Sequence, residues 1–111
     1  MSKKSPVGTA TAEARSRRAL RSAYRAEQER LAPFEELARL VIKHRAALGI
    51  SQEELAQRVG TSHSAISRIE SGRHKTSVET LQRLAHALEV RLVVGFESGP
   101  VERPVRELVS A

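Results

Sequence analysis

The chain has 111 residues, and its 19 lysines and arginines outnumber its 13 acidic residues, which gives a formal net charge of +6. The sequence pI is about 10.7, so we expect a polyanionic partner: nucleic acid, an anionic membrane surface or an acidic protein. No cysteine is present, which excludes disulfides, zinc–thiolate sites and cysteine catalysis within this chain.

The apolar content sets further bounds. No apolar run approaches the roughly 18 residues of a membrane span, and the N-terminal residues lack the apolar core of a signal peptide. We therefore expect a soluble cytoplasmic protein. The chain has three aromatic residues, Tyr24, Phe34 and Phe96. They are too few for the base-stacking surface of a single-stranded RNA binder.

The N-terminal third carries most of the charge. Residues 1–12 mix Lys, Ser, Pro, Gly and Thr without periodicity, which predicts a disordered start. Residues 13–32 are rich in Ala, Arg and Glu, a composition that favours a basic helical arm. Pro33 is expected to end this arm and to begin the next helix.

The arm presents two kinds of side chain. Leu20, Tyr24 and Leu31 fall on one helix face, where they can pack against the first helix of the following domain. The apolar stripe is thin and Trp is absent, so a membrane-surface role is disfavoured. The alternative hypothesis is contact with an acidic partner surface or with flanking DNA through exposed arginines, namely Arg15, Arg17, Arg18, Arg21 and Arg25.

Caps and glycines divide residues 33–89 into four helices joined by short connections. The first has apolar residues at Leu37, Leu40, Val41 and Leu48, and Gly49 ends it. Ser51-Gln-Glu-Glu54 is a capping box that begins a short second helix, with Leu55, Ala56 and Val59 facing inward, and Gly60 ends that helix. The third helix is expected to start at a Thr61 cap and to end at Gly72, and the fourth to start at Ser77, with Leu81, Leu84, Ala85 and Leu88 inward.

Residues 90–96 change period. Alternating side chains predict a strand, and a single strand has no partner in a helical domain. We expect it to pair antiparallel with the same strand of a second copy across a two-fold axis. Residues 97–111 contain two prolines and few apolar residues, which indicates a flexible tail. The residues predicted to form the dimer contact are Val90, Leu92, Val94 and Phe96.

The third helix has two unlike faces on a helical wheel. Its inward arc is small and apolar, with Ala65, Ile66 and Ile69. Such a helix suits the DNA major groove, because its short polar side chains can meet base edges there. The alternative for any polar face on a short helix is plain solvation. The outward arc holds His63, Ser64, Ser67, Arg68 and Ser71.

Catalysis and metal binding are disfavoured by the motifs. A Ser–His pair within residues 62–64 would need side chains that point together, whereas sequence neighbours on a helix point about 100° apart, and no nucleophile elbow is present. No glycine-rich phosphate loop occurs. We therefore expect no enzyme activity and no cofactor. We also expect no metal site, because the spacing of the histidines matches no metal-ligand motif. The four histidines are His44, His63, His74 and His86.

The segment SQEELAQRVGTSHSAISRIESGRHK resembles the Cro/CI-type (XRE) helix-turn-helix, and the resemblance spans roughly residues 35–90. It implies an all-α, lambda-repressor-like bundle with an N-terminal helical arm and a C-terminal dimerising strand. It also implies a structural ion pair between Arg45 and Glu70. The DNA contacts implied are base contacts by Ser62, His63, Ser64, Ser67 and Arg68 and phosphate contacts by Gln52, Ser71, Arg73 and Lys75.

The flanking segments resemble HigA-type antitoxins of type II toxin–antitoxin pairs. That resemblance implies a cytoplasmic homodimer, nucleoid-associated when DNA-bound, that represses its own operon at an inverted-repeat operator in double-stranded DNA. It further implies a small basic partner, a RelE/HigB-like ribonuclease toxin. The alternative is a stand-alone XRE-family regulator without a toxin partner. A pure protein-interaction role is disfavoured by the intact Gln52 and Arg68 and by the basic segment at residues 73–75.

Overall fold

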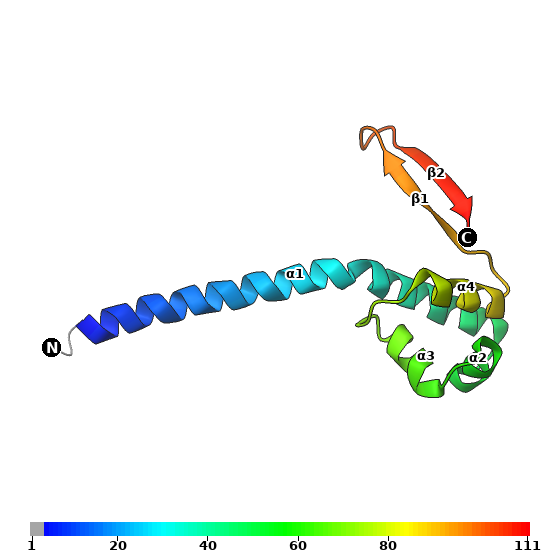
Figure 1. The fold of residues 1–111 in the computed structure, drawn as a ribbon, viewed down its shortest axis with the longest axis horizontal. Coiled ribbons are helices and arrows are strands. Elements are labelled where there is room, and N and C mark those ends of the chain that lie inside the picture. Colours follow the sequence, from blue (N-terminus) through cyan, green and yellow to red (C-terminus); the bar gives the residue numbers. More distant parts are fainter. Residues whose placement is uncertain (1–3) are drawn as a thin grey trace. The chain divides into compact units, whose positions relative to one another are not determined.

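The computed structural model describes the backbone of residues 4–111 and the side chains of residues 11–111. The chain divides at Pro33 into two units, Met1–Pro33 and Phe34–Ala111. The fold is mostly helical and also contains a β-hairpin, so the expectation of an all-α chain was too narrow. In chain order the elements are α1 (Lys4–Leu48), α2 (Gln52–Val59), α3 (His63–Glu70), α4 (Val78–Ala87), β1 (Val93–Ser98) and β2 (Val105–Ser110) (Figure 1).

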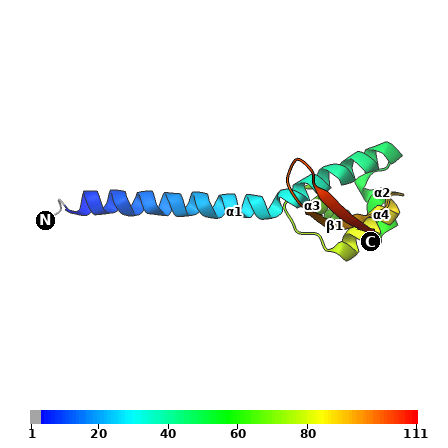
Figure 2. The same ribbon diagram turned by 90° about the horizontal axis from the view of Figure 1, so that it is seen from above.

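α1 extends beyond both boundaries that the sequence predicted for the N-terminal arm, residue 13 at its start and Pro33 at its end. The disordered start expected for residues 1–12 lies outside the described residues at positions 1–3, and from Lys4 onward it is helical. The break expected at Pro33 does not occur, because α1 includes this residue. Figure 2 draws α1 as one helical ribbon. Proline removes one backbone hydrogen bond from a helix interior. Good helix formers on both sides of Pro33 keep the helix continuous here.

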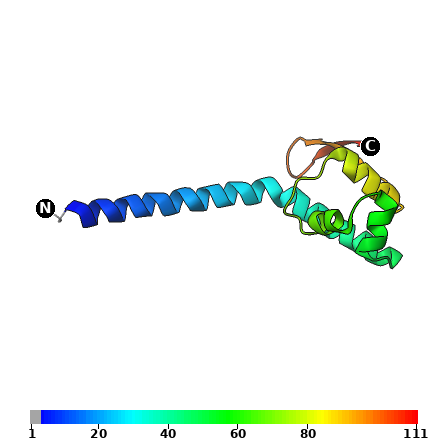
Figure 3. The ribbon, with the colours of Figure 1, turned by 60° about the horizontal axis from the view of Figure 1, so that its bottom comes forward.

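The core of the second unit comes from all four helices. Leu55 of α2, Ile66 of α3 and Leu84 of α4 are the largest fully buried side chains, and Val41 of α1 packs with them. Val59, Ile69 and Leu81 close the edges of this cluster. Each helix therefore contributes apolar side chains to one shared interior. Figure 3 shows the backbones of α2 and α3 beside the C-terminal part of α1.

The apolar stripe predicted for α1 is buried only in part. Val41 is buried, and so is Ala38, which the stripe did not include. Leu40 is 48% exposed and Leu48 is 36% exposed. The prediction that these two leucines face the core was therefore wrong, because the helices that pack against α1 cover a narrower arc than its apolar residues occupy.

The C-terminal residues form a hairpin where a single strand and a flexible tail were expected. β1 pairs antiparallel with β2 of the same chain, in a register that sets Val94 opposite Val109. The proline that precedes β2, Pro104, stands where a missing N–H does not interrupt the pairing. The partner strand therefore comes from this chain, whereas the sequence predicted one from a second copy.

Candidate nucleic-acid interface

Two short capped helices form the centre of this surface. Ser51 caps α2 by accepting a hydrogen bond from the amide of Glu54 at 3.0 Å. Gly60 ends α2 in the left-handed conformation, with φ at 82°, which glycine adopts without steric cost. Ser62 then caps α3 by accepting from the Ala65 amide at 3.1 Å. The prediction of Thr61 as this cap was wrong by one residue, and the hydroxyl of Ser62 is already used at the helix end.

The inner side of α3 is held by packing and by an ion pair. Ile66 is fully buried. The Arg45 guanidinium donates to both carboxylate oxygens of Glu70, from Nε at 2.8 Å and from Nη2 at 3.0 Å. Arg45 also donates to the carbonyl of Ile50 at 3.0 Å. These hydrogen bonds to Glu70 raise the pKa of Arg45, so the guanidinium stays charged and keeps α1 linked to the end of α3.

Gly72 brings the chain after α3 close to α1. Its φ is 71°, and it is buried. A Cβ atom at this position would lie 2.8 Å from the Cα of Glu35, closer than two carbon atoms can pack. Glycine is therefore required here for two reasons, the backbone conformation and the contact with α1.

Gln52 connects the start of α2 to both ends of α3. Its side-chain amide donates to Glu70 at 2.9 Å, and its carbonyl oxygen accepts from the Ser67 hydroxyl at 3.0 Å. The same oxygen lies 2.9 Å from Nε2 of His63. Sequence reasoning assigned Gln52 a phosphate contact, whereas the structure uses its amide to position α3. One of its two N–H groups remains for a phosphate.

The network around Gln52 also sets what His63 can offer. The Glu70 carboxylate needs a donor, so the amide nitrogen of Gln52 faces Glu70 and its oxygen faces His63. Nε2 of His63 then carries the proton that it shares with that oxygen. In that tautomer the other ring nitrogen, Nδ1, is an acceptor, suited to the exocyclic amine of adenine or cytosine.

The predicted base-contacting residues lie together on the exposed arc of α3. Ser64 and Arg68 are exposed, and their side chains have no hydrogen-bond or ion-pair partner within residues 11–111. Ser67 is exposed but donates to Gln52. Arg68 also lines a cleft between α3, the segment that follows it and α4, together with His74, Lys75, Thr76 and Arg83.

The side chains predicted to contact phosphate differ in whether they already have a hydrogen-bond partner among the described residues. Arg73 and Lys75 are exposed, and their side chains make no bond with any described residue. The hydroxyl of Ser71 donates to the Arg68 carbonyl at 2.6 Å and accepts from the Arg73 amide at 3.3 Å. Ser71 therefore closes the end of α3, and its hydroxyl is less available to DNA than those of its neighbours.

Comparison with known proteins agrees with this geometry. The helix-turn-helix family matches residues 41–94. An uncharacterized helix-turn-helix-type transcriptional regulator of Methanothermobacter thermautotrophicus is 45% identical over 49 residues, which cover 44% of this chain and 71% of that protein. The chain belongs to the helix-turn-helix family. It is accordingly a transcriptional regulator and not an enzyme.

Solved structures support the same assignment of the helix-turn-helix domain. The restriction–modification controller protein C.AhdI from Aeromonas hydrophila matches with a TM-score of 0.52 and 30% identity, over 54% of this chain and 87% of that one. The controller protein C.Esp1396I, solved as a tetramer with its natural 35 base-pair operator, matches with a TM-score of 0.50 and 26% identity, over 51% and 75%. The likenesses support the lambda-repressor-like arrangement of the helix-turn-helix domain.

Sequence reasoning missed part of the basic cleft next to α3. Thr61, Thr80 and Arg83 line it beside Arg68 and Lys75. Arg83 is held by Glu79 of the same helix at 3.0 Å. Nothing in the sequence assigns these residues to one site, because they come from the turn before α3 and from α4, and only the packing of the helices brings them together.

The described residues contain neither a metal-binding cluster nor a membrane-spanning helix. In the part of the chain that the structure describes, no three acidic or histidine side chains gather in a way that could hold a metal ion. No described helix is long and apolar enough to cross a membrane.

Proposed function

We propose that this chain is a transcriptional regulator that binds operator DNA by placing α3 in the major groove. The observation that carries the proposal is the contrast between the two arcs of α3. Its inner arc is locked by Ile66 and by the Arg45–Glu70–Gln52 network. Its outer arc presents exposed polar side chains on a rigid element. The controller protein C.Esp1396I was solved in complex with its operator, and this supports operator binding by the similar domain here.

The roles within the interface follow from reach and chemistry. Arg68 can donate two hydrogen bonds to a guanine, and Nδ1 of His63 can accept from an adenine or cytosine amine. Ser64 and Ser67 have short hydroxyls suited to a base edge or a nearby phosphate. Lys75 belongs to the exposed basic flank, where a phosphate contact positions the domain without choosing a sequence.

We propose further that the regulator binds as a homodimer through its C-terminal hairpin. Side chains directly opposite in an antiparallel pair lie on the same face, and alternate residues face the same way. One face of this hairpin therefore gathers four exposed apolar side chains: Val94 at 40%, Phe96 at 85%, Val105 at 54% and Val109 at 66%.

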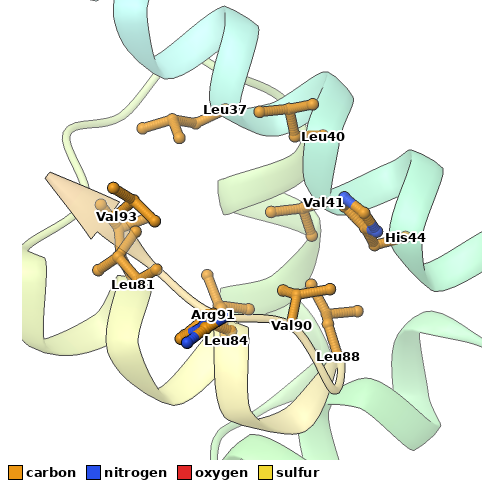
Figure 4. A pocket seen from close by; sticks show the side chains of 12 residues that line it. Leu37, Leu40, Val41, His44, Leu81, Leu84, Leu88, Val90, Arg91 and Val93 are labelled. Atoms are coloured by element: carbon orange, nitrogen blue, oxygen red, sulfur yellow. The ribbon is translucent and has the colours of Figure 1, made fainter. Parts of the chain in front are cut away.

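The four residues predicted to form the dimer contact divide into two pairs. Val94 and Phe96 lie on the open hairpin face, whereas Val90 and Leu92 line an apolar groove between α1 and α4 (Figure 4). The groove holds about 250 Å³, which is below the roughly 300–1,000 Å³ of a typical small-molecule site. Because Val94 and Phe96 are exposed on one face of the hairpin, we assign that face to the dimer contact. Two joined domains would contact half-sites about 34 Å apart, one helical turn of DNA.

The proposed function has two forms, a stand-alone regulator and an antitoxin that also binds a toxin. The relatives named above are gene regulators and restriction–modification controllers rather than antitoxins. They support the stand-alone regulator over the HigA-type antitoxin with its RelE/HigB-like toxin. We propose the stand-alone form, with double-stranded operator DNA and a second copy of this chain as the partners.

Selection from a random duplex pool tests the DNA-binding proposal. The wild-type chain is expected to enrich an inverted repeat. On that repeat, Arg68→Ala should cost about 1–3 kcal/mol at one base position. Arg103→Ala is the matched control, because Arg103 is also exposed but lies in the hairpin turn. The absence of any enriched sequence, or equal losses for Arg68→Ala on specific and random DNA, would contradict base recognition by α3.

Sedimentation of two glutamate variants tests the dimer. Phe96→Glu places a charge on the apolar hairpin face and should give a folded monomer. Val101→Glu is the matched control, since Val101 is 94% exposed in the turn between the strands and should remain a dimer. A Phe96→Glu protein that sediments like the wild type would rule out this face as the contact.

A further inference from the structure

The N-terminal half of α1 carries an unpaired arginine face. Between residues 15 and 25 there are five arginines and no acidic residue. All five are exposed, and none makes a hydrogen bond or ion pair with another described side chain. Within residues 11–33, the ion pair is Arg30 with Glu27, one turn further along. The charge of this stretch is therefore not neutralised by the helix that carries it.

The spacing concentrates that charge on one side. Arg17, Arg21 and Arg25 follow one another at four-residue intervals, so they project from one face at steps of about 6 Å along the axis. At about 100° per residue, Arg18 falls beside them. Like charges four residues apart destabilise an isolated helix by about 0.2–0.5 kcal/mol per pair. A bound polyanion offsets this repulsion, because its negative charges attract all of the arginines.

The chemistry of the face suits phosphate. Guanidinium groups present planar donor forks that match phosphate oxygens in pairs. The apolar neighbours are sparse, with Leu20 and Tyr24 as the exposed large side chains of this part of the helix. The core of a protein–protein interface is poor in charge and rich in apolar area, so an acidic protein fits this face less well than a nucleic-acid backbone does.

We propose that this arginine face binds the phosphate backbone of duplex DNA beside the operator, as a contact independent of sequence. The inference rests on the proposed function, because α2 and α3 bring the chain to DNA and thereby raise the local concentration of phosphate around the arm. Residues 1–31 carry a net charge of +5, against +2 for residues 32–96. The arm thus supplies most of the long-range attraction, while α3 selects the sequence.

The test compares two triple variants of the full-length chain. Arg17→Gln, Arg21→Gln and Arg25→Gln remove the stripe, with little loss of helix propensity because Gln and Arg are similar helix formers. The control, Arg39→Gln, Arg91→Gln and Arg103→Gln, removes three exposed arginines from the second unit. Circular dichroism verifies that both proteins remain helical.

Binding to two DNA duplexes is measured at salt concentrations from about 50 to 200 mM, a range over which phosphate contacts change the affinity strongly. One is the selected site alone, and the other is the same site with random flanks. Each phosphate contact contributes about 0.9 to the slope of log affinity against log salt, so the stripe variant should lose about 2.7 per chain on the flanked duplex. Wild type and control should bind the flanked duplex more tightly than the short one, and the stripe variant should not.

The outcomes separate this inference from the function on which it rests. If the stripe variant keeps the wild-type slope and the gain from flanks, the arm proposal is overturned and an acidic protein becomes its expected partner class. If the wild-type chain binds duplexes with a steep salt slope but prefers no sequence, the operator proposal fails and the arm proposal stands. If the wild type binds no duplex at all, both are overturned.

Discussion

The helical domain and the hairpin of the same unit are stabilised in opposite ways. In the domain, residues from four helices meet in one interior, and Leu55, Ile66 and Leu84 are almost fully shielded from water. In the hairpin, every residue of both strands is exposed. An isolated hairpin is marginal in water. The domain therefore has a buried core of its own, whereas the hairpin is held mainly by its backbone pairing.

The largest effect should come from the domain core. Ile66→Ala removes a side chain that is 0% exposed, and such truncations cost about 2–5 kcal/mol. The matched hairpin change, Leu108→Ala, affects a side chain that is 60% exposed and should cost less than about 0.5 kcal/mol. Urea unfolding followed by circular dichroism measures both. Equal losses would erase the distinction between the two regions.

The next effect concerns the ion pair beneath α3. Glu70→Gln leaves Arg45 with a neutral partner. Removing one partner of a fully buried pair costs about 3–5 kcal/mol, and because the Arg45 side chain is 20% exposed we expect about 2–3 kcal/mol. Operator affinity should fall as well, since Gln52 loses a carboxylate that fixes its orientation. Both points are tested by measuring the free energy of unfolding and the operator affinity of the Glu70→Gln protein. Unchanged stability would mean that packing alone holds α3.

A third change acts on the hairpin alone. A Cβ atom at Gly95 would overlap the backbone carbonyl of Glu107 on β2, so Gly95→Ala should separate the strands at that point. Overpacking of this kind costs about 1–3 kcal/mol. Amide hydrogen exchange should quicken in both strands, while the four helices keep their protection. Ser98→Ala is the control near the end of the same strand. Loss of protection across the helices would show that the hairpin supports the domain.

The smallest effect is expected at the domain surface. Lys75→Ala changes an exposed side chain without a partner among the described residues, so stability should move by less than about 0.5 kcal/mol. DNA affinity should fall alike on every sequence, and the salt slope should drop by about 0.9. A loss confined to one operator sequence would instead make Lys75 a base contact.

Local signals in the sequence located much of the domain. Ser51 and Ser77 stand at the N-caps where the capping pattern put them. The cap of α3 was misplaced by one residue, because Thr61 and Ser62 both suit that position and geometry alone selects Ser62. The chain belongs to the helix-turn-helix family, as the motif indicated, whereas the HigA-type subfamily gained no support. Flanking segments carry fewer constraints than a packed core, so their resemblance was the weaker guide.

Other features depended on contacts that local patterns do not contain. The role of Gln52 needed the positions of Glu70, Ser67 and His63, which lie 11 to 18 residues away in sequence. The hairpin needed the pairing of residues 93–98 with residues 105–110, and two prolines near the turn concealed it. Each of these is a long-range arrangement of groups that look ordinary in their local sequence.

By itself, the sequence determined the period of each helix, the glycines with positive φ between helices and the polar outward arc of α3, because caps, turns and apolar spacing act over a few residues. Tertiary structure alone decided which part of the α1 stripe is buried, that Gln52 positions α3, and that β1 pairs with β2. These outcomes depend on which surfaces meet. A side chain acquires its partner only when the chain brings distant residues within hydrogen-bonding or packing distance.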